Sequence, residues 1–74
     1  MLNKSDIEYI KKEYSKIRNL FLGGQYQDVI TKTKVLLKKD PYQATFYNYI
    51  ALSYNNLKKI NFAKEYLLKG LEYN

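Results

Sequence analysis

The sequence has no cysteine and no histidine. These absences exclude a disulfide, a zinc site of the usual kind, and catalysis by a histidine base or a cysteine nucleophile. The carboxylates are spread along the chain without a close acidic pair. The glycine pair at 23–24 ends a helical pattern and is not part of a phosphate-binding loop. We therefore expect no enzyme, no metal site and no cofactor.

Acidic residues are few: 7 Asp+Glu stand against 13 Lys+Arg, a net charge of +6. All the basic residues except Arg18 are lysines, which are strongly hydrated and less suited than arginine to a shaped anion site. Acid–lysine pairs at i,i+4 spacing favour helices at three places, namely Glu8–Lys12, Asp28–Lys32 and Glu65–Lys69. The lysines without such a partner could form a basic patch for nucleic acid or an anionic membrane, although we expect an ordinary solvated face: Lys34, Lys38, Lys39, Lys58 and Lys59.

Long apolar runs are also missing. No stretch approaches the roughly 18 apolar residues of a membrane-spanning helix. The segment 1–15 holds no unbroken apolar run of the kind that a secretory signal needs. We therefore expect a cytoplasmic protein without a membrane span.

The first half of the chain carries apolar residues at three- and four-residue steps, the spacing of amphipathic helices. The first helix is predicted to begin at a capping box formed by Ser5 and Glu8. It ends at the glycine pair, since glycine adopts the left-handed cap conformation without a steric clash. The second helix is predicted over about 26–39 and ends at Asp40, because a residue before a proline avoids the helical region.

The second half repeats this arrangement. The third helix is predicted over about 42–57, with Asp40 as its N-cap and Gln43 three residues later as in a capping box. A polar turn follows, and Asn61 is the expected N-cap of the fourth helix. No useful strand alternation appears, so the predicted fold class is all-α.

The two halves align when the sequence is shifted by about 34 residues, a period typical of stacked helical repeats, which we call the repeat period. Turn falls on turn, with Gly24 over Lys58, and apolar or small residues fall on one another. The aligned pairs are Ile17–Ala51, Leu20–Tyr54, Tyr26–Ile60, Val29–Ala63, Thr33–Leu67, Leu36–Gly70, Leu37–Leu71 and Asp40–Asn74. The small residues Ala51, Ala63 and Gly70 are expected where paired helices approach closely.

These residues resemble the tetratricopeptide repeat. The second half matches the family's spacing at Tyr47, Ile50, Ala51, Tyr54, Ala63 and Leu67, and the first half at Gly24, Tyr26, Val29, Leu36, Leu37, Asp40 and Pro41. Glu13 and Lys16 depart from it, standing where the family has an aromatic residue and a leucine. The resemblance implies a single domain over residues 1–74, with four antiparallel helices as two stacked hairpins of an α-solenoid. Repeat one spans about 10–43, with its first helix extended from 5, and repeat two about 44–74. An unrelated four-helix bundle is the alternative.

The resemblance also implies a concave groove, lined by the first helix of each repeat, that binds an extended and possibly acidic peptide. The positions that match are Lys11, Tyr14, Arg18 and Phe21 from the first helix, and Asn48, Tyr49, Leu52 and Asn55 from the third. Asparagine can hold a backbone amide, tyrosine offers a flat contact with a polar tip, and Lys or Arg pairs with an acid.

The fourth helix is apolar although no helix follows it in this sequence. Asn74 stands one residue before the proline expected to close a second repeat, so we expect either a cut from a longer array or self-association into a homo-oligomer. The residues predicted to mediate self-association are Phe62, Tyr66, Leu67, Leu68 and Leu71. The predicted function is a protein–protein interaction module. The alternatives are a purely structural or engineered repeat assembly unit and a basic helical module that binds nucleic acid.

Overall fold

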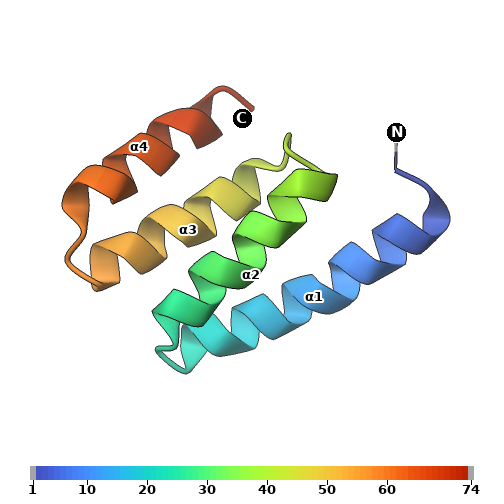
Figure 1. Ribbon diagram of the computed structural model, residues 1–74, viewed down its shortest axis with the longest axis horizontal. Coiled ribbons are helices and arrows are strands. Elements are labelled where there is room, and N and C mark those ends of the chain that lie inside the picture. The colour runs from blue at the N-terminus through green and yellow to red at the C-terminus, as the bar shows by residue number, and fades with distance from the viewer. Residues whose placement is uncertain (1, 74) are drawn as a thin grey trace.

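In the computed structural model, which describes residues 2–73, the chain folds into four α-helices and these residues contain no strand. The helices are α1 (Lys4–Leu22), α2 (Tyr26–Lys39), α3 (Ala44–Asn56) and α4 (Ile60–Leu71). Consecutive helices run in opposite directions and lie next to one another in chain order (Figure 1). The prediction of an all-α fold with four antiparallel helices is therefore confirmed.

The two helical hairpins share one turn geometry. Gly24 has a backbone φ of 76° and Lys58, one repeat period later, has a φ of 65°. The helix ends on either side of the turn also correspond, Leu22 with Asn56 and Tyr26 with Ile60. The backbone hydrogen bonds that close the turns match as well, since the amide of Gln25 donates to Leu20 and that of Lys59 donates to Tyr54, both at 2.9 Å. The period read from the sequence is thus repeated in the backbone. The alignment of Asp40 with Asn74 lies outside the described residues.

The main core fills the space between α1, α2 and α3. Buried side chains from all three helices meet there: Ile17, Val29, Leu36 and Phe46. Partly buried apolar residues surround them: Ile10, Tyr14, Leu20, Phe21, Leu37 and Tyr49. Burial of this apolar surface is the main force that holds the first hairpin against α3.

A closer contact joins α3 to α4. Ala51 and Ala63 are buried, as is Gly70. A Cβ placed on Gly70 would lie 2.9 Å from the Cβ of Tyr47, a distance at which something must shift. The predicted close approach is therefore confirmed at Gly70, and Ala51 and Ala63 are buried as well.

The predicted N-cap of α1 is wrong. The helix begins at Lys4, and its N-cap is Asn3, whose side-chain oxygen accepts a hydrogen bond from the amide of Asp6 at 2.8 Å. Asn is as good a cap as Ser, and it stands two residues earlier. Ser5 therefore lies inside the helix and does not form a capping box with Glu8.

The predicted starts of α3 and α4 are also wrong. Asp40 is the C-cap of α2 and precedes a turn, and α3 begins only after Gln43. The carboxylate of Asp40 instead accepts a hydrogen bond from the side-chain amide of Gln43 at 2.9 Å. In the second hairpin α4 begins directly after Lys59, so Asn61 is a helical residue and not a cap. The turn geometry fixes this start, because Lys59 already makes the hydrogen bond that closes the turn.

Only one of the three predicted i,i+4 ion pairs forms among residues 2–73, namely Glu65–Lys69 at 3.1 Å. Lys32 turns away from Asp28 and lies 3.6 Å from Glu13, which also holds Lys16 at 3.0 Å. Because Glu13 is on α1 and Lys32 on α2, this cluster links the two helices of the first hairpin. None of the four helices is both long and apolar enough to cross a membrane.

Candidate functional site

The residues predicted to line the concave groove fall into two groups. Tyr14, Phe21 and Tyr49 are half-buried and pack edge-on, with Tyr49 centred 5.7 Å from Tyr14 and 5.4 Å from Phe21. This aromatic cluster holds α1 against α3, and burial raises the pKa of the Tyr49 hydroxyl. The other predicted residues are exposed: Lys11, Arg18, Asn48, Leu52 and Asn55.

Some of the predicted residues line hollows in the surface, and they do not all line the same one. Lys11 and Tyr14 line a hollow of about 450 Å³ between the middle of α1 and the start of α3. Asn48, Leu52 and Asn55 line hollows between α3 and α4. Arg18, Phe21 and Tyr49 are not among the residues that line these hollows. The single concave groove formed by these eight residues stays a prediction.

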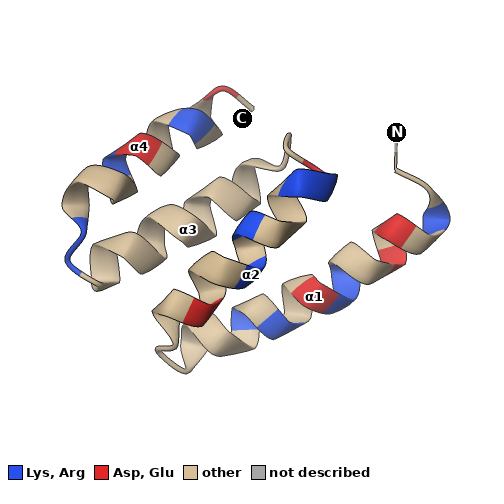
Figure 2. Ribbon diagram, viewed as in Figure 1, with Lys and Arg blue, Asp and Glu red and all other residues tan. Residues whose placement is uncertain are grey.

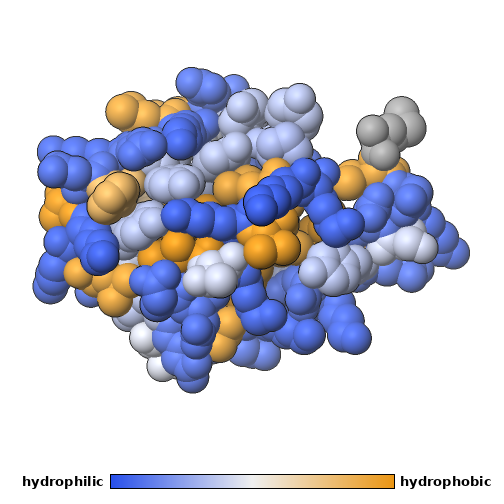
Figure 3. All heavy atoms as spheres, viewed as in Figure 1, coloured by the Kyte–Doolittle hydropathy of each residue, from blue (hydrophilic) through white to orange (hydrophobic). Residues whose placement is uncertain are grey.

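Two adjoining hollows lie between α3 and α4, with volumes of about 290 and 280 Å³. Leu67 lines both, so they form one surface, which we call the α3/α4 face. Its lining residues are Ala44, Asn48, Ala51, Leu52 and Asn55 from α3, and Ile60, Ala63, Lys64, Leu67, Gly70 and Leu71 from α4. In the view of Figure 3, apolar residues reach the surface at separate places among hydrophilic ones. The floor is made of small buried residues, and exposed leucines stand around it.

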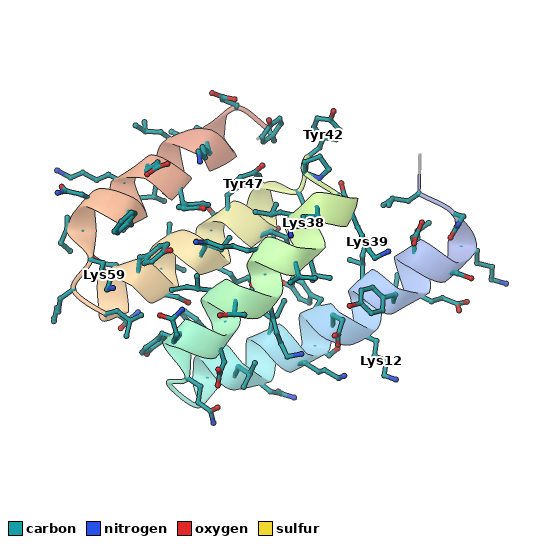
Figure 4. All side chains as sticks on the ribbon, viewed as in Figure 1. Lys12, Lys38, Lys39, Tyr42, Tyr47 and Lys59 are labelled. Atoms are coloured by element: carbon teal, nitrogen blue, oxygen red, sulfur yellow. The ribbon has the colours of Figure 1, made fainter. Side chains whose placement is uncertain are left out.

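A second feature runs along the other side of α4. Six aromatic rings are linked by contacts of 5.2–6.4 Å into a continuous ladder, in the order Tyr42, Tyr73, Tyr47, Tyr66, Tyr54 and Phe62. Tyr42 and Tyr47, labelled in Figure 4, mark one end of it. No expectation from the sequence included the ladder, although the spacing of Phe62 and Tyr66 places them on one side of a helix.

The ladder divides the residues that were predicted to mediate self-association. Phe62 and Tyr66 belong to the ladder, where Phe62 stacks on Tyr54 at 5.2 Å. Leu67 and Leu71 belong to the α3/α4 face. Leu68 is exposed and lines neither hollow of that face. The five residues therefore lie on different sides of α4 and do not form one surface.

The lysines predicted to lack partners do not collect into a single patch. Lys34 donates a hydrogen bond to the hydroxyl of Tyr54 at 2.8 Å, which raises the pKa of its ammonium group. Lys39 lies 3.4 Å from the carboxylate of Asp6. Lys38 and Lys59 lie on different parts of the molecule, on α2 and in the turn between α3 and α4 (Figure 4). Charged residues lie on α1, α2 and α4, and α3 carries none (Figure 2).

Comparison of the chain with protein-family models, curated proteins and solved structures found no match. The geometry of the two hairpins and of the surfaces between their helices therefore carries the functional argument.

Proposed function

We propose that this chain is a protein-interaction module that binds a segment of another protein on its α3/α4 face. One observation carries the proposal, a comparison of the two hairpins. Residues of the α3/α4 face stand one repeat period after residues that, in the first hairpin, are covered by α3: Ile10–Ala44, Tyr14–Asn48, Ile17–Ala51, Val29–Ala63, Leu36–Gly70 and Leu37–Leu71. In the second hairpin Ala51, Ala63 and Gly70 are buried, but Asn48 and Leu71 are exposed, and no further helix is described after α4.

Exposure differs accordingly between equivalent positions. Thr33 is completely buried in the first hairpin, whereas Leu67 is 46% exposed in the second. Leu37 is partly buried against the core, whereas Leu71 is 65% exposed. A contiguous apolar surface with a polar rim is the usual mark of an interface. These differences in exposure support the proposal that the α3/α4 face binds a partner.

The resemblance to the tetratricopeptide repeat supports the same class of function. Three of its implied groove residues, Asn48, Leu52 and Asn55, line the α3/α4 face and are exposed. A rigid frame of packed helices supports tight binding, because little conformational entropy is lost by the module when a partner docks.

A selection of peptides from a random library displayed on phage tests the proposal. The chain serves as bait, and the selected peptides are then measured against Leu67→Glu and a matched control, Val35→Glu. Leu67 and Val35 are both 46% exposed, but Val35 lies on α2 and lines neither hollow. We expect the peptides to lose at least about tenfold in affinity for Leu67→Glu and to keep their affinity for Val35→Glu. Failure to select any peptide, or peptides that bind both variants equally, would contradict the proposal.

A further inference from the structure

We propose that the α3/α4 face takes an amphipathic helix of a partner protein, with bulky apolar residues on its inner stripe and acidic residues along one edge. This inference rests on the proposed function and specifies what the face binds. It follows from three observations: what fills the equivalent surface of the first hairpin, how the two surfaces differ, and which charges stand at the rim.

The occupant of the equivalent surface in the first hairpin is a helix. It is α3, whose Phe46 and Tyr49 pack against the core of that hairpin, and whose Ile50 and Ser53 are buried. These residues are spaced i, i+3, i+4 and i+7, the stripe of one helix face. Because the helix ends beside the turn, the turn conformation and the turn hydrogen bonds recur after one repeat period, the second hairpin offers a backbone frame of similar geometry.

The second surface is lined by smaller side chains than the first. Where the first hairpin has Ile17, Val29 and Leu36, the second has Ala51, Ala63 and Gly70. The smaller side chains leave the two hollows of about 290 and 280 Å³. Close packing at an interface requires that these hollows be filled. The docking helix is therefore expected to place large apolar side chains, such as Leu, Ile or Phe, at the stripe positions.

The rim of the α3/α4 face is basic. Lys64 lines the face at the position where the first hairpin has the buried Ile30, and no acidic residue lines either hollow. Lys58 and Lys59 stand in the adjoining turn and are exposed. Glu65, the neighbouring acid on α4, already pairs with Lys69. Charge complementarity therefore favours a helix with acidic residues on the edge that faces Lys64.

A second copy of the chain fits the face poorly. The residues of α1 that correspond to the contact stripe of α3 are Lys12, Ser15, Lys16 and Asn19, and all are polar and exposed. Lys12 points away from the other helices in Figure 4. Docking α1 of one copy onto α4 of another would bury this polar stripe and bring two chains of charge +6 together.

Two synthetic helical peptides test the inference. Each has about 18 residues, enough for a helix of five turns, with the same Leu/Ile stripe at i, i+3, i+4 and i+7. One carries Glu on both flanks of the stripe and the other Lys. A third peptide keeps the composition of the Glu peptide with the stripe scrambled. Binding to the whole chain is measured by fluorescence anisotropy, and peptide helicity by circular dichroism.

We expect the Glu peptide to bind at least about tenfold more tightly than the Lys peptide and the scrambled peptide. Lys64→Glu should reverse the preference between the charged peptides, Leu67→Glu should remove binding of both, and Val35→Glu should change neither. Equal binding of the Glu and Lys peptides, or binding of the scrambled peptide, would overturn the inference. So would a dimer of the chain, seen by sedimentation, that Leu67→Glu dissociates, because it would assign the face to a second copy.

The phage selection distinguishes failure of the helix proposal from failure of the proposed function. Library peptides that depend on Leu67 but bind in an extended form, or without acidic residues, would overturn the helix proposal and leave the interaction module in place. Library peptides that ignore Leu67 would overturn both.

Discussion

Lys58 occupies a backbone conformation that suits glycine. Its φ of 65° lies in the left-handed region, where the Cβ of an L-residue approaches the following carbonyl oxygen. Gly24 stands at the equivalent position of the first hairpin with a φ of 76°, and a Cβ added there would have open space around it. The two turns therefore share one backbone conformation, and its left-handed position is occupied by Gly24 in one and by Lys58 in the other.

The substitution Lys58→Gly should stabilise the protein, and Gly24→Ala should destabilise it by a similar amount. Relief of the left-handed conformation is worth about 1–2 kcal/mol. Against this, the greater conformational entropy of glycine stabilises the unfolded chain by about 0.4–1 kcal/mol. The expected net effect is about 0.5–1 kcal/mol in opposite directions, or about 2–8 °C in melting temperature for a domain of this size.

Urea unfolding followed by circular dichroism measures both variants. Lys58→Ala is the control, since it removes the same charge but keeps the Cβ, and it should leave the free energy of unfolding close to that of the wild type. If Lys58→Gly gives no more stability than Lys58→Ala, the backbone at Lys58 is not strained and the equivalence of the two turns fails.

Three further changes test the interior and the ion pairs. Thr33→Val should stabilise the protein by about 1 kcal/mol in urea unfolding, because the buried Thr33 hydroxyl has no hydrogen-bond partner among residues 2–73. Gly70→Ala should lower the free energy of unfolding by up to about 2 kcal/mol, since the clash with Tyr47 outweighs the usual helical preference for Ala; a gain in stability would refute the close approach. The hydrogen bond from Lys16 lowers the pKa of Glu13 below 4.5, so its stabilising effect is complete above pH 4.5 and is lost as the pH falls through the lowered value. Glu13→Gln should therefore lose less stability than the wild type as the pH falls from 5 to 3, measured by thermal melting.

The sequence was sufficient to predict the helices and their pairing. Apolar spacing located all four helices, and the shift by one repeat period anticipated that Gly24 and Lys58 would occupy equivalent turns. Both features arise from local chemistry, namely a helical repeat of apolar residues and residues that tolerate a tight turn. Helix starts were less predictable, because Ser5 and Asn3 are equally good caps and the choice depends on which amide each can reach.

The sequence indicated less about the side-chain contacts around the candidate site. Of the expected groove residues, Tyr14, Phe21 and Tyr49 pack against one another. The ladder along α4 depends on contacts between residues far apart in the sequence, such as Tyr42 with Tyr73, and no local pattern specifies them. Sequence spacing identifies the face of a helix, whereas the partner of that face is set by how the helices pack.

The two hairpins show what a repeat leaves free to vary. Their turns coincide, so the same backbone supports Ile17, Val29 and Leu36 in the first and Ala51, Ala63 and Gly70 in the second. Large side chains in the first hairpin fill the space under α3 and contribute about 1.5–3 kcal/mol each through burial. Small side chains in the second allow α4 to approach α3 closely and leave hollows beside it. The small side chains of the second hairpin therefore have two effects. They let α3 and α4 pack closely, and they line the hollows of the α3/α4 face.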